Sequence, residues 1–352
     1  MKSFMLGAVL LGAALLGFVL YATNLEEVWR YLGALGVSGI VVMFVLYLGS
    51  FVFEVLSWQF TLLSVPLDGR WLYRLWKVLM FGAALEKVTP FAGLGGEPIK
   101  AVVLKKHHGV PYGEGTASLV LTRMSDVVAL ALFITMGLCL ILSEDVLSVP
   151  FQVGAAAGLS LLVLNTGIFF ALQRYRAFSK VRAWLDRRFG ERLGARVGSV
   201  LDMIKEVEDH LVDFYVAHPK RFVLSIFAAF LQWMMGALTA YVALGLLGHP
   251  VSLADAIVIE AVTLLVISTL FFVPGDLGTQ EVAMVTIVEG LTGSSELGLA
   301  LAAIRRAHDL LWVAWGLVIG SSYSMTRAEL VAEEHDDEHD AGEPLQRGSG
   351  AR

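Results

Sequence analysis

Long apolar stretches separated by short polar segments dominate this chain of 352 residues. A stretch of roughly 20 apolar residues is enough for a helix to cross a hydrocarbon core of about 30 Å. Six stretches meet this length, at about residues 4–22, 37–63, 115–142, 150–172, 221–248 and 297–322. The pattern therefore predicts an all-α, polytopic integral membrane protein with about six spanning helices.

The first stretch has two interpretations. Residues 4–22, with Lys2 before them, would suit either a signal peptide or a retained first helix. The apolar run is long for a signal peptide, and no clean small-residue cleavage site follows it. We therefore favour a retained helix.

Two further apolar regions, 72–107 and 252–291, are each interrupted in the middle. Their pieces 78–85 and 279–288 are too short to cross a bilayer alone. Broken helices at membrane depth are stable only where they are buried in protein or line a wet cavity. We interpret both regions as re-entrant helical hairpins.

The two interruptions carry the same sequence pattern. One copy runs from Pro90 to Glu97 and the other from Pro274 to Glu281, seven positions in each case (97 − 90 and 281 − 274). An Arg-x-x-Asp motif follows each copy, as Arg123-Met124-Ser125-Asp126 and as Arg306-Ala307-His308-Asp309. The chain therefore contains an internal repeat with charges at membrane depth, a pattern typical of transporters.

Basic residues give the two repeats a direction. Lys and Arg are frequent in segments 64–115 and 173–221 and absent from 222–304. Because cytoplasmic loops carry an excess of Lys and Arg, both rich segments should face the cytoplasm. Repeat one, about 37–142, then starts outside, whereas repeat two, about 221–322, starts inside. The sequence predicts an inverted repeat, with both termini in the cytoplasm.

Composition agrees with a bilayer location, since 57% of the residues are hydrophobic and only 16% are charged. We expect residues 1–325 to form one membrane domain, with 173–220 as a cytoplasmic amphipathic linker between the repeats. The acidic tail, 326–352, should be disordered. The single cysteine, Cys139, excludes a disulfide framework, and nothing indicates a nucleic-acid-binding domain.

Proline and glycine should shape the two hairpin tips. Proline ends an incoming half-helix because it lacks an N–H group and clashes with the preceding turn, and glycine permits a tight reversal. The residues of this kind are Pro90, Gly93, Gly95, Gly96, Pro274, Gly275 and Gly278. Each outgoing half-helix then starts with free N–H groups and a positive dipole end, which suits a lipid phosphate.

Glu97 and Glu281 each lie in the first turn of an outgoing half-helix, and two roles stay open for them. Either carboxylate could cap the free N–H groups of its own helix. Alternatively, it could pair with a cationic head group or with an arginine inside the membrane.

The two Arg-x-x-Asp motifs also have two interpretations. Arg123 with Asp126, and Arg306 with Asp309, lie on one helix face and could neutralise each other. Charges at membrane depth are costly and usually mark a transport path, so their recurrence favours a functional role. We expect the two arginines to hold the phosphate of a passing lipid head group.

Three more charged residues belong to the candidate site. Lys100 either attracts anionic head groups or extends towards the interface. Arg305 is either a second phosphate ligand or an interfacial anchor, and Glu54 could pair with a basic residue of a hairpin.

These features favour a transporter whose cargo is a phospholipid or a polyprenyl-phosphate-type lipid. The alternative is a membrane-embedded enzyme, or a partner subunit, that modifies a lipid head group. An enzyme would need a nucleophile, a base or a metal cluster, and the histidines of the membrane region are scattered at 107, 108, 249 and 308. We therefore expect no catalytic residue, no metal and no cofactor. Proton coupling through Asp126, Asp309 or the glutamates and passive equilibration both stay open.

The repeated motifs resemble the flippase-like membrane domain of lysylphosphatidylglycerol synthases, over about residues 5–325. The resemblance implies a lipid flippase in the plasma (inner) membrane of a bacterial cell, working as a homo-oligomer or beside a lipid-modifying enzyme. In the full-length synthases, a separate cytoplasmic domain attaches the amino acid to phosphatidylglycerol. Residues 323–352 are too few for such a domain, so we expect no aminoacyl transfer by this chain alone.

Overall fold

The computed structural model describes residues 25–88, 96–144, 217–269 and 278–321, together with the isolated positions 160, 164, 167, 214 and 323. Within these ranges the chain forms eight helices and no strand, which confirms the predicted all-α class. The spans predicted at 4–22 and 150–172, the linker and the tail lie outside these ranges or meet them only at isolated positions. The predicted number of six spans therefore stays a prediction.

Four of the described helices belong to each half of the chain. The first half contains α2 (Leu25–Thr61), α3 (Gly69–Val88), α4 (Glu97–His108) and α5 (Tyr112–Glu144). The second half contains α9 (Pro219–Leu246), α10 (Leu253–Thr269), α11 (Thr279–Thr292) and α12 (Ser295–Ser321). By length and composition, three of the described helices can cross a membrane, in the segments Trp29–Thr61, Tyr112–Ile141 and Pro219–Leu246.

Helix α2 contains a kink at Gly36, where φ is 67° and ψ is 173°. A positive φ is easily reached only by glycine, because other side chains clash with their own backbone there. The span predicted at 37–63 corresponds to the part of α2 that follows this kink.

The two interrupted apolar regions are two pairs of short helices, α3 with α4 and α10 with α11. Each pair begins with a side-chain cap: Asp68 Oδ1 accepts the Trp71 N–H at 2.7 Å, and Ser252 Oγ accepts the Asp255 N–H at 3.0 Å. Asp68 and Ser252 occupy the same position in the two repeats. They are 184 residues apart (252 − 68), which is also the separation of the motif residues Glu97 and Glu281 (281 − 97). The tips, 89–95 and 270–277, lie outside the described residues.

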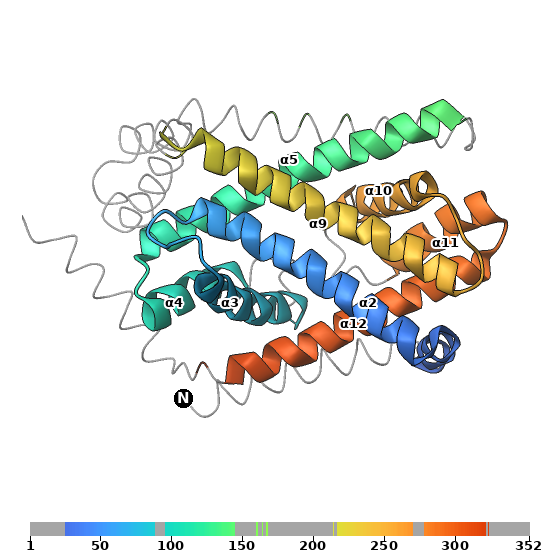
Figure 1. Cartoon of the computed structure of the whole chain (residues 1–352), viewed down its shortest axis with the longest axis horizontal. Coiled ribbons are helices and arrows are strands. Elements are labelled where there is room, and N and C mark those ends of the chain that lie inside the picture. The colour runs from blue at the N-terminus through green and yellow to red at the C-terminus, as the bar shows by residue number, and fades with distance from the viewer. Residues whose placement is uncertain are drawn as a thin grey trace, which may run out of the picture.

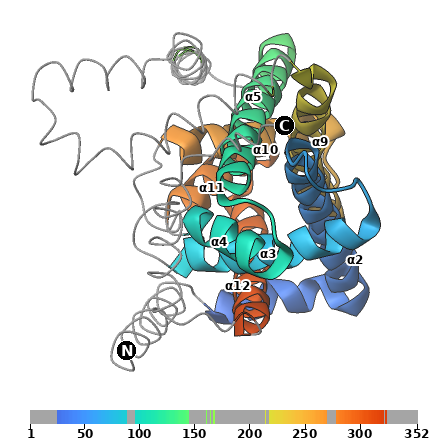
Figure 2. The same cartoon turned by 90° about the vertical axis from the view of Figure 1, so that its left-hand side faces the viewer.

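The two halves pack in the same pattern. Helix α2 lies along α9, α3 packs against α2 and α12, and α10 packs correspondingly against α9 and α5. Helix α4 packs against α3 and α5, just as α11 packs against α10 and α12. The two short pairs lie at opposite ends of the long axis (Figure 1). Viewed from the α3–α4 end, α3 and α4 lie between α5 and α12 (Figure 2).

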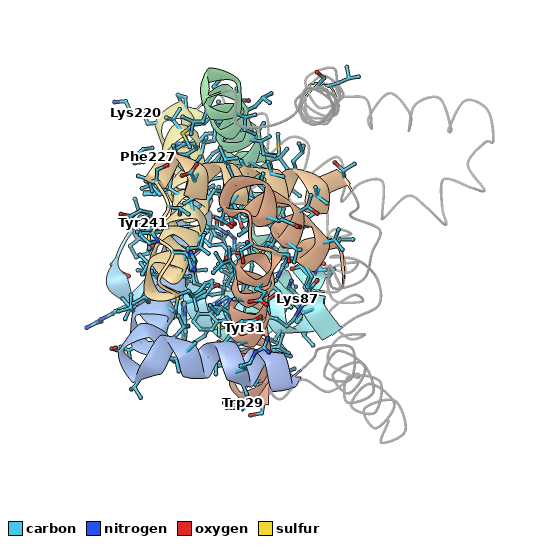
Figure 3. The ribbon with its side chains drawn as sticks, turned by 90° about the vertical axis from the view of Figure 1, so that its right-hand side faces the viewer. Trp29, Tyr31, Lys87, Lys220, Phe227 and Tyr241 are labelled. Atoms are coloured by element: carbon cyan, nitrogen blue, oxygen red, sulfur yellow. The ribbon has the colours of Figure 1, made fainter. Side chains whose placement is uncertain are left out.

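Each short helix pair is packed on its own apolar core. Trp58, Leu75 and Leu104 are fully buried around α3 and α4, and Ile259 and Met284 are fully buried around α10 and α11. The outer face of α9 instead carries exposed apolar side chains such as Phe227 and Tyr241 (Figure 3). Apolar side chains on the outside suit a helix that is surrounded by lipid.

Two serines mark the place where α2 crosses α9. The Ser57 hydroxyl donates to the Ser225 carbonyl at 3.0 Å, and the Ser225 hydroxyl donates to the Ser57 carbonyl at 2.9 Å. Small residues let two helix backbones approach closely, and reciprocal hydrogen bonds then join them.

Candidate functional site

The first charge cluster gathers around Glu97, at the start of α4. Glu97 Oε1 accepts a hydrogen bond from Lys100 Nζ at 2.9 Å and lies 3.1 Å from Arg123 Nη2 on α5. Arg123 Nη2 also donates to Glu86 Oε1 on α3 at 2.9 Å. No side chain caps the first turn of α4 at Gly96, so Glu97 forms ion pairs instead of capping its helix.

Lys100 is buried within this cluster because α3 leaves room for it. A Cβ atom at Gly82 would lie 2.5 Å from Lys100 Cγ and 2.9 Å from its Cδ, so only glycine fits there. The lysine side chain is 5% exposed. Of the two roles predicted for Lys100, extension to an interface therefore does not fit, and the amine pairs with Glu97 in the interior.

A cavity of about 110 Å³ adjoins this cluster, between α2, α3, α4, α5 and α9. Its polar and charged lining consists of Glu54, Ser57, Trp58, Glu97, Lys100, Thr122, Arg123, Asp126, Gln232 and Trp233. The second carboxylate oxygen of Glu97 is buried and has no hydrogen-bond partner in the described part of the chain. The structure thus brings four predicted site residues, Glu97, Lys100, Arg123 and Asp126, together with Glu54 around one polar space.

The second charge cluster has the matching arrangement around Glu281, at the start of α11. Glu281 Oε1 accepts from Arg306 Nε at 3.0 Å and also contacts Arg306 Nη2. Its other oxygen accepts the Gly278 N–H at 2.9 Å. Glu281 therefore performs both roles that the sequence left open, one with each oxygen. Gly278 has a φ of 81°, which positions its N–H for this bond.

Arg305, beside Arg306 on α12, forms a two-pronged ion pair with Glu260 of α10. Arg305 Nη1 and Nη2 each donate to a different Glu260 oxygen, both at 2.8 Å. Glu260 is only 1% exposed. Parallel hydrogen bonds between a guanidinium and a carboxylate are among the strongest in proteins, so this pair fixes α12 against α10.

Asp309 contacts the other half of the chain. Its Oδ2 lies 3.9 Å from Lys87 Nζ on α3, and its Oδ1 lies 3.4 Å from His308 Nδ1. The His308 ring stacks on Tyr47 of α2, with 3.7 Å between ring centroids, and also contacts Trp312. Neither Arg-x-x-Asp motif is simply self-neutralising, because Arg123, Arg306 and Asp309 each form an ion pair with a residue of another helix.

Helix α3 joins the two clusters through adjacent residues. Glu86 pairs with Arg123 of the first motif, and Lys87, in the last turn of α3, pairs with Asp309 of the second. The clusters differ in access: the Arg123 side chain is 50% exposed, whereas the Arg306 side chain is 5% exposed. The arginine of the first motif is therefore accessible, whereas that of the second is buried.

The remaining predicted site residues are placed as follows. Gly96 and Gly278 precede the first residues of α4 and α11, as expected for hairpin turns. Pro90, Gly93, Gly95, Pro274 and Gly275 lie outside the described residues, so their predicted role at the tips stays a prediction.

Sequence reasoning missed three charged members of the clusters: Glu86, Lys87 and Glu260. Glu260 carries a recognisable signal, because it is a single carboxylate within the strongly apolar helix α10. Glu86 and Lys87 carry none, since they resemble the other charged residues of the amphipathic helix α3.

The apolar helices, their exposed outer faces and the buried charge clusters define a polytopic α-helical membrane protein. Residues 5–316 match the family described as the lysylphosphatidylglycerol synthase TM region. The chain belongs to this family, as its repeated motifs predicted.

Two curated relatives are similar over most of their length. A UPF0104 membrane protein of Methanothermobacter thermautotrophicus is 25% identical over 269 residues, which cover 71% of this chain and 75% of the relative. A UPF0104 membrane protein of Pyrococcus horikoshii is 19% identical over 314 residues, covering 87% of this chain and 92% of the relative. No solved structure matches the chain.

Proposed function

We propose that this protein moves a phospholipid or a polyprenyl-phosphate-type lipid between the two leaflets by alternating access. The observation that carries the proposal is the matched pair of Glu–Arg contacts, Glu97 with Arg123 and Glu281 with Arg306. Each contact joins the start of a short helix to a long helix of its own half. Matched charged contacts in two repeats are expected where one site must be reached from either side.

The arrangement of the short helix pairs supports inverted repeats. The pairs lie at opposite ends of the molecule (Figure 1), and the two halves pack in the same pattern. The distribution of Lys and Arg supports a cytoplasmic location for the α3–α4 end, and we propose that both chain termini lie on that side. On this proposal, α3–α4 enters from the cytoplasm and α10–α11 enters from the opposite side.

The arginines supply the chemistry for a lipid phosphate. A planar guanidinium binds phosphate and carboxylate oxygens with the same geometry, so a phosphate can replace a carboxylate partner. Arg123 is half-exposed and adjoins the cavity, whereas Arg306, which pairs with Glu281, is buried. This difference suits a transporter in which one motif is open to cargo while its counterpart is closed.

The test uses purified protein in liposomes that contain fluorescently labelled phospholipid. We expect wild-type protein to equalise the label between the leaflets and Arg123→Gln to abolish this movement. Arg30→Gln is the matched control, because Arg30 is exposed and lies far from the motifs in the sequence. A folded Arg123→Gln protein, with a wild-type gel-filtration profile, that still moves lipid would refute the proposed role of Arg123.

The same liposomes distinguish transport from head-group chemistry. Mass spectrometry of the recovered lipid should find the label chemically unchanged. A modified head group, formed by this protein alone or with an added synthase, would instead favour the enzyme or partner-subunit function.

A further inference from the structure

The first charge cluster contains more acids than bases. Four carboxylates, Glu54, Glu86, Glu97 and Asp126, adjoin the cavity or its arginine, and among the described residues only Lys100 and Arg123 oppose them. The second cluster is balanced by comparison, since Glu260, Glu281 and Asp309 lie with Lys87, Arg305 and Arg306. An excess of like charge in a partly dehydrated cavity is unfavourable and is relieved when a carboxylate binds a proton.

Glu54 is a cavity carboxylate without an ion-pair or hydrogen-bond partner among the described residues. It lines the cavity from α2. Glu86 and Glu97, by contrast, are both held by Arg123. A proton can therefore bind Glu54 without breaking an existing contact.

The charged groups around Glu54 come from three neighbouring helices: Glu86 on α3, Glu97 and Lys100 on α4, and Arg123 and Asp126 on α5. Helix α9 contributes Ala229, Gln232 and Trp233 to the cavity, and all three are uncharged. Helix α12 packs against α2 through Trp312, whose ring contacts Phe51. Within the described residues, no three acidic, histidine or cysteine side chains are placed to hold a metal ion, which favours a proton as the bound cation.

We infer that the cavity binds one exchangeable proton on Glu54 and that this proton moves together with the lipid. A proton leaves water on one side, binds a carboxylate oxygen of Glu54, and returns to water on the other side as the lipid changes leaflet. The inference rests on the proposed lipid transport, and it identifies a proton gradient as the source of energy for that transport.

Electrostatics couples the proton to the lipid. An ionised Glu54 repels an anionic phosphate and competes for Arg123, whereas a neutral Glu54 does neither. Proton binding therefore strengthens phosphate binding, and by reciprocity phosphate binding strengthens proton binding. Proton and lipid should consequently travel in the same direction.

Liposomes with a pH difference across the membrane test this coupling. The probe is fluorescently labelled phosphatidylglycerol, and its distribution between the leaflets is measured at steady state. With one proton per lipid, a difference of one pH unit should enrich the probe about tenfold in the leaflet that faces the alkaline side. Protein-free vesicles with the same gradient give the background. Equal distribution with wild-type protein would overturn the inference while leaving lipid transport intact.

Three variants and a second gradient sharpen the result. Glu54→Gln should bring the ratio to about one, Glu54→Asp should retain part of the enrichment, and the exposed control Glu289→Gln should match wild type. If Glu54→Gln responds to the gradient as wild type does, Glu54 is not the proton carrier. Enrichment by a sodium gradient at equal pH would replace the proton with a metal cation.

A second measurement, which does not depend on lipid transport, tests whether Glu54 is the proton site. Thermal unfolding midpoints of wild type and Glu54→Gln are compared in detergent between about pH 5 and pH 8. We expect wild type to lose stability relative to Glu54→Gln as the pH rises, because an ionised Glu54 adds to the excess negative charge. Parallel curves would overturn the proton site. If wild type moves no lipid in any condition but the curves diverge, the transport proposal fails and the proton site stands.

Discussion

Lys87 Nζ lies 3.9 Å from Asp309 Oδ2, although the two residues are far apart in the sequence. This ion pair therefore connects the two halves of the chain. Lys87 lies in the last turn of α3, the first helix of one short pair, and Asp309 belongs to the Arg-x-x-Asp motif of the opposite half. This ion pair is a direct electrostatic link between α3 and α12, so we expect its strength to affect how the two halves move relative to each other.

A double-mutant cycle measures that link. Because the Lys87 side chain is 40% exposed, we expect the pair to contribute about 1 kcal/mol or less. Lys87→Met and Asp309→Asn should each lower the free energy of unfolding, and the double variant should lose less than their sum. Strictly additive losses would show that the two residues do not interact. The lipid translocation rates of the same three variants should be non-additive in the same way.

The Glu260–Arg305 pair should matter more for stability, because Glu260 is almost fully buried. Glu260→Gln leaves the Arg305 guanidinium without its carboxylate, which should cost about 3 kcal/mol. The paired replacement, Glu260→Gln with Arg305→Gln, should recover part of this loss because no buried charge is then left alone. Glu289→Gln serves as the exposed control. Unfolding midpoints in detergent provide the measurement, and a loss for Glu260→Gln no larger than for Glu289→Gln would contradict the expectation.

Substitution of Gly278 tests the backbone geometry at the start of α11, in the α10–α11 helix pair. A side chain at a φ of 81° is strained although the surrounding space is open, so Gly278→Ala should destabilise the protein by about 1–2 kcal/mol. Gly245→Ala is the matched control, since that glycine also has open space but lies within α9 without a positive φ. The control should be neutral or slightly stabilising. Equal effects of the two changes on the unfolding midpoint would argue against a strained position 278.

His108, the last residue of α4, should make stability depend on pH. Burial lowers the pKa of His108 from its ordinary value, and the charges of Arg74, Lys77 and His107 lower it further. The unfolded chain then binds a proton more readily than the folded protein does, so stability falls as the pH falls below about 6.5. His108→Gln should weaken this acid-induced loss, whereas the exposed His249→Gln should not. The measurement is the unfolding midpoint of wild type and both variants as the pH is lowered below about 6.5. Equal acid-induced losses in wild type and His108→Gln would contradict the expectation.

Much of the fold could be predicted because long apolar stretches have few alternatives in a membrane. The predicted spans at 115–142, 221–248 and 297–322 each correspond to a helix within a few residues, and the span at 37–63 corresponds to the part of α2 after its kink. The kink at Gly36 was not predicted, since an isolated glycine in an apolar run indicates no particular geometry. Helix α2 therefore begins earlier than the pattern suggested.

The candidate site was predictable where a charge interrupts an apolar helix, and less so elsewhere. Arg123 and Arg306 could be identified because charges are costly at that depth, and their repeated spacing added weight. Their partners depend on tertiary packing: Glu86 meets Arg123 only because α3 and α5 place both beside α4. The different access of the two arginines could not be predicted, because the sequence motifs are nearly equivalent.

The close approach between Gly82 and Lys100 limits how this protein can vary in evolution. Any side chain at position 82 would occupy the space that the lysine alkyl chain fills. A relative with a larger residue at the position of Gly82 should therefore have a shorter one at the position of Lys100, and would then lack the amine that binds Glu97. Co-variation of these two positions would divide the family into members with and without a buried cation beside the first glutamate.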